Sequence, residues 1–342
     1  MQRVVVLGAS GFLGSRVLAA LAASGWAAPV AVSRNPFRAA PAPDADAPPP
    51  TERLACDAAS APDLLRLLAA ADAVVNCTAG APSATLAVAR ALAQAPATCR
   101  IVHVSSMAVY GDAHGLVGED TPLPGDLGGY AGGKVAAERA LSPHAGAVML
   151  RPGCVFGPGS GQWTARIARL LHARRLGDLG AAGDGACNLA PVADVVAAVL
   201  AALHRPVAGG AFNLALPDPP SWNAFLTRYA VALGAVPVAR IPARRLRLES
   251  RLAVPLHAAS LVLRRAAPRL GARVPDALTP SLLALMRQDI TLDHRRTDAR
   301  LGIRRTSLDE ALREAAASLR PHAPLPDPAQ RLPAPRSTAH AA

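Results

Sequence analysis

The sequence predicts an α/β protein in which helices cover both faces of a parallel β-sheet, followed by a smaller, mainly helical lobe. In the first 150 residues, short β-branched runs alternate with alanine-rich stretches of helical length, the pattern of repeated strand–helix units. Beyond Pro152 this alternation becomes irregular, because proline and glycine interrupt the helical stretches. With 342 residues, 51% of them hydrophobic, the chain can bury the core of a main domain and a smaller lobe.

Four strands and four helices are predicted in the main domain. The strands are Val4 to Leu7, Val30 to Val32, Ala73 to Asn76 and Ile101 to Val104, and the helices are Phe12 to Ala23, Pro62 to Ala70, Ser83 to Ala95 and Tyr130 to Leu141. We expect residues 1–152 to form this domain, with 187–215 returning to it. Residues 153–186 and 216–320 then form the lobe. Two stretches rich in proline and alanine, 39–50 and 321–342, are predicted to be a loose surface excursion and a disordered tail.

Composition narrows the class of protein. The five cysteines are odd in number, widely spaced and free of any Cys-x-x-Cys pair, which argues against a disulfide framework or a zinc site. The short apolar run after Met1 is too brief for a signal peptide, and no stretch reaches the length of a membrane-spanning helix. We therefore expect a cytoplasmic protein without a bound metal.

The formal charge of +12 is concentrated near the end of the chain. Residues 240–305 contain fifteen arginines and five acidic residues. Aromatic residues make up only 3% of the chain and no zinc-finger or base-stacking pattern accompanies the arginines, so we do not expect a nucleic-acid partner. An anionic ligand or an acidic membrane surface explains this charge at least as well.

A glycine-rich turn follows the first predicted strand and opens the first helix. It reads Gly8-Ala9-Ser10-Gly11-Phe12-Leu13-Gly14. Glycines in this context bring backbone N–H groups and the helix N-terminus up to a pyrophosphate. The main domain is therefore predicted to be a Rossmann-type doubly wound sheet that binds a dinucleotide through Gly8, Ser10, Gly11, Phe12, Leu13 and Gly14.

The end of the second strand indicates which dinucleotide is bound. An acidic residue there selects NAD by binding the ribose 2′-hydroxyl, whereas an arginine favours the 2′-phosphate of NADP. This chain has Ser33-Arg34-Asn35 and no acid. NADP(H) is favoured, with Ser33 and Arg34 in the site, and NAD(H) stays open.

The residues expected to carry chemistry are Ser106, Tyr130 and Lys134. Lys134 is the only lysine among 36 basic residues, and it lies four residues after Tyr130, where helical side chains share a face. A compact ammonium fits beside a ribose hydroxyl and a phenol in a way that guanidinium does not. The cation favours the phenolate of Tyr130, which exchanges a proton with a secondary alcohol or ketone while Ser106 binds the substrate oxygen.

Together these motifs resemble the extended short-chain dehydrogenases/reductases of the NAD-dependent epimerase/dehydratase family, over residues 1 to about 320. The resemblance implies that Ser106, rather than Ser105, is the catalytic hydroxyl, because it lies four residues before Tyr110. It also implies further cofactor contacts, namely Asp57 with adenine, the fourth-strand turn containing Cys77, Thr78 and Ala79, and the nicotinamide-lining segment containing Pro152, Gly153 and Val155.

The same resemblance bears on the reaction. Family members that dehydrate nucleotide sugars carry an Asp-Glu pair directly after the catalytic hydroxyl, and this chain has Met107-Ala108. Neither residue is an acid or base, so a 4,6-dehydratase is not expected. Sugar-nucleotide enzymes usually hold the diphosphate with an arginine in the segment that corresponds to Gly183 to Leu189, which contains no cation here, although Arg287, Arg295 or Arg296 could replace it.

Two apolar stretches, Leu252 to Leu263 and Leu278 to Met286, resemble the lobe of hydroxysteroid and flavonoid-type reductases, although core packing explains such stripes more often than a ligand channel does. We predict an NAD(P)-dependent oxidoreductase acting on a ketone or secondary alcohol. The alternatives are a nucleotide-sugar 4-epimerase with tightly bound NAD and a non-catalytic NADP-binding sensor or assembly subunit. The expected partner is the small-molecule substrate, and a homodimer or peripheral membrane contact stays open.

Overall fold

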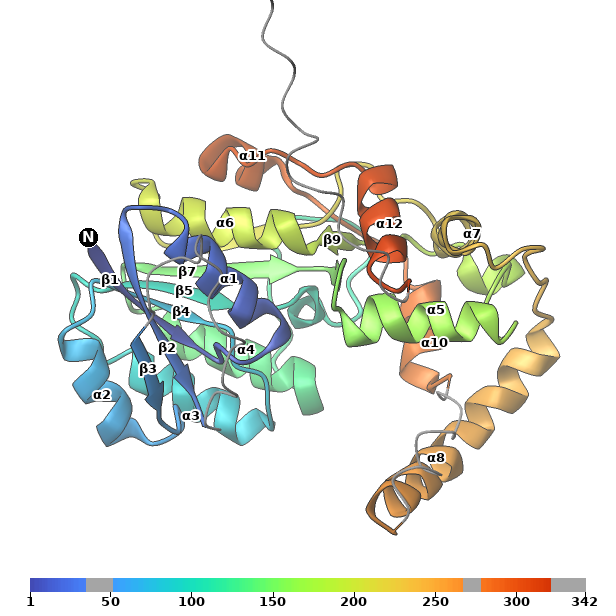
Figure 1. The fold of residues 1–342 in the computed structure, drawn as a ribbon, viewed down its shortest axis with the longest axis horizontal. Coiled ribbons are helices and arrows are strands. Elements are labelled where there is room, and N and C mark those ends of the chain that lie inside the picture. Colours follow the sequence, from blue (N-terminus) through green and yellow to red (C-terminus); the bar gives the residue numbers. More distant parts are fainter. Residues whose placement is uncertain (35–51, 267–277, 321–342) are drawn as a thin grey trace, which may run out of the picture.

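The computed structural model describes residues 1–34, 52–266 and 278–320 (Figure 1). Seven parallel strands form its main sheet. In spatial order they are β10 (Gly210–Leu214), β7 (Ala147–Pro152), β5 (Arg100–Val104), β4 (Ala73–Asn76), β1 (Gln2–Leu7), β2 (Ala27–Ser33) and β3 (Glu52–Ala55). The predicted α/β class is confirmed. Strands β3, β7 and β10 were not delimited by the sequence analysis, and β10 lies in the segment 187–215 that was expected to return to the main domain.

Helices cover both faces of this sheet (Figure 1). One face carries α1 (Phe12–Ala22) and α6 (Val192–His204), and the other carries α2 (Ala61–Ala69), α3 (Pro82–Leu92) and α4 (Gly129–Leu141). Val4 and Val6 are buried on the α1–α6 side, whereas Val5 and Leu7 are buried on the α2–α4 side. Because successive side chains of a strand point to opposite faces, a strand covered on both sides reads as the unbroken apolar run seen here.

The strand order reverses between β1 and β4. These two strands are neighbours in the sheet, but the chain leaves β1 toward β2 on the opposite side. Ligands of open α/β sheets bind outside the carboxyl ends of the strands at such a switch point. Gly8 follows β1 and Cys77 follows β4, and a Cβ atom added to Gly8 would lie 3.0 Å from the Cys77 carbonyl oxygen.

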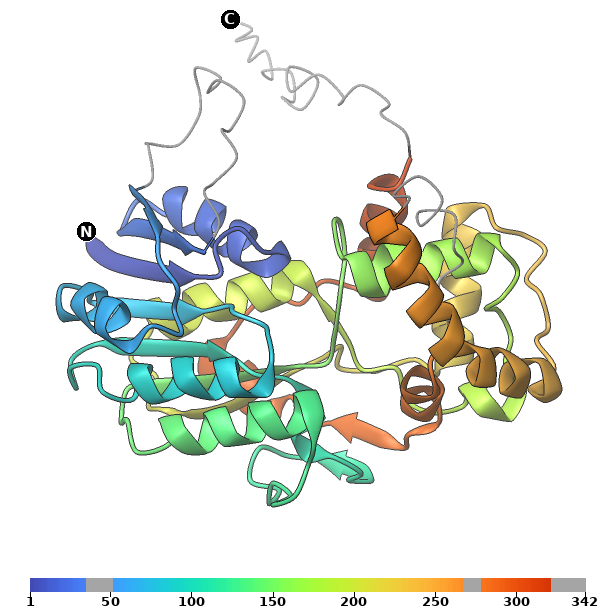
Figure 2. The ribbon, with the colours of Figure 1, turned by 90° about the horizontal axis from the view of Figure 1, so that it is seen from below.

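The remaining elements form a second, mainly helical region beside the sheet (Figure 2). A two-stranded sheet of β8 (Cys154–Phe156) and β9 (Leu189–Pro191) leads into it. Its helices are η2 (Gly161–Ala165), α5 (Arg166–His172), η3 (Gly180–Gly183), α7 (Trp222–Leu233), α8 (Ala243–Ala266), α10 (Pro280–Arg287) and α12 (Leu308–Ala317). Their core contains Phe156, Phe225 and Met286, together with Leu282 and Leu283.

The predicted apolar stretch from Leu278 to Met286 belongs to the hydrophobic core of the lobe. The buried side chains of α10 lie in the lobe's hydrophobic cluster, as the core-packing interpretation of Leu278 to Met286 required. Most side chains of the earlier stripe, Leu252 to Leu263, lie outside the described part of the chain, as do the predicted surface excursion at 39–50 and the predicted tail at 321–342.

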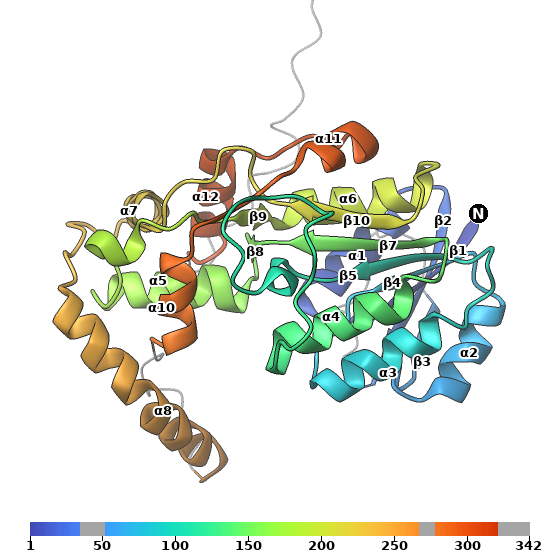
Figure 3. The ribbon, with the colours of Figure 1, turned by 180° about the vertical axis from the view of Figure 1, so that it is seen from behind.

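Residues 290–301 come back to the main domain before α12 joins the lobe. Strand β11 (Ile290–Leu292) pairs with β6 (Gly115–Val117), and α11 (Arg295–Leu301) contacts β10 and α6 (Figure 3). Within residues 1–34, 52–266 and 278–320, no helix is long and apolar enough to cross a membrane, and no cluster of three or more His, Cys, Asp or Glu side chains suited to a metal ion was found.

Candidate active site

Helix α4 presents Tyr130 and Lys134 one turn apart. Between them, Gly132 and Gly133 allow the helix to approach its neighbours closely. A Cβ atom on Gly132 would lie 1.7 Å from the carbonyl oxygen of Leu127, and one on Gly133 would lie 2.9 Å from the Cα of Pro82 at the start of α3. The two glycines, which lower helix propensity, therefore fix the depth at which the tyrosine and lysine are held.

Lys134 is buried, with 3% of its surface exposed. Its Nζ donates a hydrogen bond of 2.7 Å to the carbonyl oxygen of Val104 at the end of β5 and lies 5.9 Å from the centroid of the Tyr130 ring. Burial lowers the pKa of the ammonium to about 8, while the neighbouring Cys77 and Glu138 act in the opposite direction. The ammonium is thus anchored at the carboxyl edge of the sheet.

Ser106 meets Tyr130 at the same edge. It is the N-cap of a short helix, η1 (Met107–Tyr110), and its Oγ accepts a hydrogen bond of 3.2 Å from the Ala108 N–H. Tyr130 is 54% exposed as a whole residue, but burial at its hydroxyl end raises the pKa of the phenol, and a hydrogen bond with Ser106 partly offsets this.

The direction of the Tyr130 shift differs from our expectation of a cation-stabilised phenolate. The Lys134 ammonium is directed to the Val104 carbonyl, and the loss of hydration around the phenol outweighs the effect of Ser106. With its pKa raised, the phenol is protonated near neutral pH.

A buried polar network behind these residues was not found from the sequence. Arg151 on β7 forms a buried ion pair with Glu138 on α4, with 2.6 Å between Nη2 and Oε2. Its Nη1 donates to the Tyr110 hydroxyl at 2.8 Å, and that hydroxyl donates to Asn213 Oδ1 at 2.7 Å. One guanidinium thus ties the helix that carries Tyr130 to the short helix that Ser106 begins.

Two signals for this network were available in the sequence. Glu138 lies four residues after Lys134 and so shares its helical face, and Arg151 interrupts an apolar strand of which every residue is buried. A charge in such a strand requires a buried partner.

The glycine turn has the shape that a pyrophosphate requires. Gly8 has a φ of +75°, a conformation that favours glycine. A Cβ atom on Gly14 would lie 2.2 Å from the Gly8 carbonyl oxygen. Neither position can carry a side chain, so the backbone of the turn stays open to a phosphate group. Gly11 is the N-cap of α1, which begins with Phe12 and Leu13. The Ser10 and Ser33 hydroxyls lie 2.7 Å apart and join the turn to the end of β2. These residues fit a dinucleotide.

The other predicted cofactor residues lie after neighbouring strands of the same sheet. Arg34 and Asp57 are exposed directly after β2 and just beyond β3. Cys77, Thr78 and Ala79 follow β4, where the Thr78 hydroxyl and N–H both donate to Asn76 Oδ1 at 2.6 and 3.0 Å.

The thiol of Cys77 is chemically quiet, because burial raises its pKa to about 12. Pro152 ends β7 and Val155 lies in β8, with Gly153 between them. A Cβ atom on Gly153 would lie 2.0 Å from the Asn188 carbonyl oxygen. The structure thus gathers the predicted residues along one edge of the sheet.

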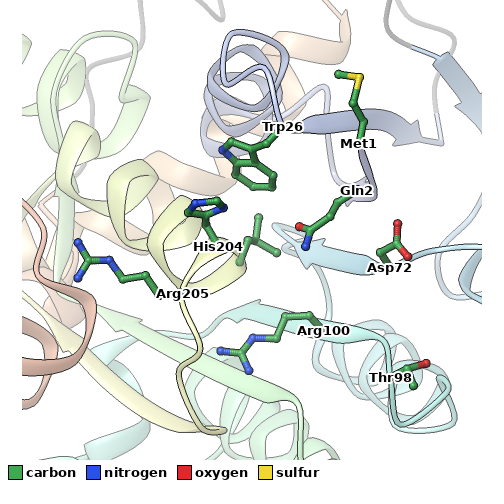
Figure 4. A pocket seen from close by; sticks show the side chains of 9 residues that line it. Met1, Gln2, Trp26, Asp72, Thr98, Arg100, His204 and Arg205 are labelled. Atoms are coloured by element: carbon green, nitrogen blue, oxygen red, sulfur yellow. The ribbon is translucent and has the colours of Figure 1, made fainter.

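A cavity of about 600 Å³ lies elsewhere, where β1 and β5 begin (Figure 4). Trp26 and His204 form part of its wall, with ring centroids 5.1 Å apart. Arg100 points toward it, but its Nε donates to the Ala202 carbonyl oxygen at 3.0 Å near the end of α6, the usual role of a cation at a helix C-terminus. The cavity lies at the amino edge of the sheet, opposite the residues described above.

Comparison with known proteins identifies the family to which this chain belongs. The model of the NAD dependent epimerase/dehydratase family matches residues 4–215. The protein YeeZ of Escherichia coli (strain K12) is 30% identical over 139 residues, 40% of this chain and 47% of YeeZ. The chain thus matches about half the length of this curated relative.

Two solved structures share the fold over nearly their whole length. MoeE5 in complex with UDP-glucuronic acid and NAD is 25% identical, with a TM-score of 0.65 over 92% of this chain and 98% of MoeE5. The human epimerase family protein SDR39U1 (isoform 2) with NADPH is 21% identical, with a TM-score of 0.65 over 93% of this chain and 100% of that protein. The family resemblance expected from the sequence motifs is confirmed. Because the matched span, residues 4–215, exceeds half of the chain, this protein belongs to the NAD dependent epimerase/dehydratase family.

Proposed function

We propose that this protein is an NAD(P)-dependent oxidoreductase that interconverts a ketone and a secondary alcohol, with Tyr130 as the acid and base. The proposal is supported by the contacts of Tyr130 with Ser106 and Lys134 and by the hydrogen bond that holds Lys134 at the carboxyl end of β5. Family membership supports a nucleotide-dependent reaction.

Each of the three side chains has a distinct role in this proposal. When bound at the glycine turn, a nicotinamide nucleotide supplies or accepts the hydride. The protonated phenol of Tyr130 gives its proton to the ketone oxygen, which Ser106 holds by a hydrogen bond. In the reverse direction Tyr130 takes the proton back. Lys134 is anchored on the Val104 carbonyl, and its remaining N–H donors would hold the ribose of the nucleotide. The lobe built around α7 and α10 would bind the substrate.

The alternative is a nucleotide-sugar 4-epimerase, supported by the similarity to MoeE5, which was solved with UDP-glucuronic acid and NAD. Of the three arginines that were candidates for the diphosphate, the exposed Arg287 has no ion pair among the described residues and stays a candidate. The other two favour the reductase. Arg295 forms a 2.5 Å ion pair with Asp293, and Arg296 pairs with Asp120 and lies 3.7 Å from Glu119. Both guanidinium groups already have carboxylate partners, and binding a diphosphate would require these pairs to break.

We further propose that NADP(H) is the preferred nucleotide and that the protein works in a reducing compartment such as the cytoplasm. Ser33 and the exposed Arg34 stand at the end of β2, and neither offers the carboxylate that binds the 2′-hydroxyl of NAD. All five cysteines are free thiols, and none is paired as in a disulfide-stabilised secreted protein.

The test is mass spectrometry of nucleotide released from the purified protein, followed by a screen for reduced-cofactor oxidation over ketones and UDP-sugars. Net oxidation of NADPH by a ketone is the expected result. Tightly retained NAD, together with UDP-sugar interconversion and no net oxidation, would establish the epimerase instead. Nucleotide binding with no turnover of any substrate, unchanged in Tyr130→Phe, would indicate a sensor or assembly subunit.

A further inference from the structure

Helix α8 projects from the helical lobe as an arm, which is visible from two opposite sides (Figures 1 and 3). Its first half is held on the body of the protein. Leu246 and Ala253 are buried, and Glu249 forms an ion pair of 2.7 Å with Arg175 in which each side chain is 14% exposed. The arm therefore leaves the lobe from a fixed base, and the side of the helix away from these anchors faces solvent.

That side carries a distinctive set of residues, the α8 face, defined here as Arg244, Arg247, Leu248, Arg251 and Leu252. All five are exposed, with 58% of Leu248 and 46% of Leu252 accessible. Their spacing of three or four residues places them on one stripe of the helix. Exposed leucines one turn apart, flanked by arginines, form a small amphipathic surface.

Within the described part of the chain, the charges of this face have no acidic counterparts. Elsewhere in the arginine-rich segment, Arg240 pairs with Asp178, Arg295 with Asp293 and Arg305 with Asp298. Among the described residues, no carboxylate lies within ion-pair distance of Arg244, Arg247 or Arg251. The acid on the same stretch of helix, Glu249, is already shared by Arg175 and Arg245.

We propose that the α8 face docks on an anionic lipid bilayer. A basic helix with exposed leucines lies in the plane of a membrane with its apolar side chains in the headgroup region, and each arginine near such a surface adds attraction to acidic lipids. The exposed leucines favour a lipid surface. Nucleic acid is disfavoured, because no aromatic side chain accompanies the arginines of this face for base stacking. A second copy of the same face would bring like charges together.

The experiment is co-sedimentation of the full chain with phosphatidylcholine vesicles that contain phosphatidylserine, compared with pure phosphatidylcholine vesicles. We expect binding to the acidic vesicles only, weakening as salt is raised. Replacing Arg244, Arg247 and Arg251 by glutamine should lower the partition coefficient about 100-fold. Replacing Leu248 and Leu252 by serine should lower it roughly tenfold while keeping the dependence on acidic lipid.

The matched control replaces three exposed arginines outside the lobe's arm, Arg90, Arg300 and Arg313, by glutamine. This removes the same net charge and should leave vesicle binding nearly unchanged. Thermal unfolding and nucleotide affinity of all variants should match the parent, so loss of binding is separated from loss of folding or of the proposed enzymatic function. Equal loss in the control, vesicle binding unaffected by the α8 changes, or binding to RNA but not to vesicles would each overturn the proposal.

Discussion

The carboxyl edge of the parallel sheet and the helical lobe are held together by different forces. At the edge, buried charges have partners of fixed geometry, as in the Lys134–Val104 hydrogen bond and the Arg151–Glu138 ion pair. In the lobe, aromatic rings pack edge to face, with 5.3 Å between the ring centroids of Phe156 and Phe225. Directional bonds fix where a reacting atom lies, whereas apolar packing tolerates exchange of side chains of similar volume. The rigidity of the edge therefore fits the chemistry proposed for it, and the packing of the lobe fits variation in the substrate proposed to bind there.

The strongest test of this division is Tyr130→Phe, which removes only the proposed acid. General acid–base catalysis contributes about 100- to 10,000-fold, so we expect kcat to fall roughly 1,000-fold while nucleotide affinity is retained. Stopped-flow or steady-state oxidation of NADPH measures the first, and fluorescence titration of the nucleotide measures the second.

Tyr110→Phe provides the matched control. This tyrosine is also close in sequence to Ser106, but it is 1% exposed and its hydroxyl is bonded to Arg151 and Asn213. Tyr110→Phe should lower the free energy of unfolding by about 1 kcal/mol, because its hydrogen bonds are deleted. It should lower kcat less than tenfold. Similar loss of kcat in both variants would mean that Tyr130 acts through structure and not as an acid.

A second test compares one disruption in each region. Breaking a buried ion pair leaves an uncompensated charge, so Glu138→Gln should lower the free energy of unfolding by about 3 kcal/mol. Phe225→Ala in the lobe should cost about as much, through the cavity it creates. Urea unfolding measures both.

The two variants should differ in function although they match in stability. Glu138→Gln loosens the helix that carries Tyr130 and Lys134, and so should reduce kcat and shift its pH profile, because Glu138 supports the charged form of Lys134. Phe225→Ala should leave nucleotide affinity at the parent value. If Phe225→Ala weakened nucleotide binding by as large a factor as Glu138→Gln lowers kcat, packing in the lobe and charge pairing at the edge would not have separate effects on function.

The sequence predicted the parts of the edge that depend on local spacing. The glycine turn follows directly from its place between a strand and a helix, and Tyr130 and Lys134 are joined by helical periodicity. The polar network could not be predicted in the same way, because Tyr110 and Asn213 are separated by 103 residues and Asn213 is placed opposite Arg151 only by the pairing of β7 with β10. The pairing of Arg296 with Asp120 depends on the return of α11 to the sheet, which no local pattern indicates.

A smaller effect concerns the buried ammonium at the edge. Burial lowers the pKa of Lys134 from 10.5 to about 8. Between these pH values the unfolded chain binds more protons than the folded chain. The contribution of Lys134 to the free energy of unfolding therefore increases as the pH rises. The buried thiols change the other way, because burial raises the pKa of Cys99 to about 11 and also raises that of Cys187. The informative quantity is therefore the difference between the parent and Lys134→Met.

We expect the stability advantage of Lys134→Met over the parent to shrink by on the order of 2 kcal/mol between about pH 8 and pH 10. Urea unfolding of both proteins across this range measures it, and the shared thiols cancel in the comparison. A difference that stays constant with pH would mean that Lys134 keeps its ordinary pKa and that the polar edge does not dehydrate its cation.

The smallest expected effect lies at the exposed end of the same edge. Arg34 is on the surface directly after β2, where a guanidinium meets a 2′-phosphate bidentately but in contact with water. Removing it in Arg34→Gln should weaken NADPH binding about tenfold, as expected for a screened surface charge, and leave NADH binding unchanged. Titration of both nucleotides against both proteins measures this, and Arg90→Gln, at an exposed arginine of α3, is the control for charge alone. Equal weakening of NADPH binding in the two variants would mean that Arg34 contributes only general positive charge, and nucleotide choice would then rest on the partly buried Ser10–Ser33 contact.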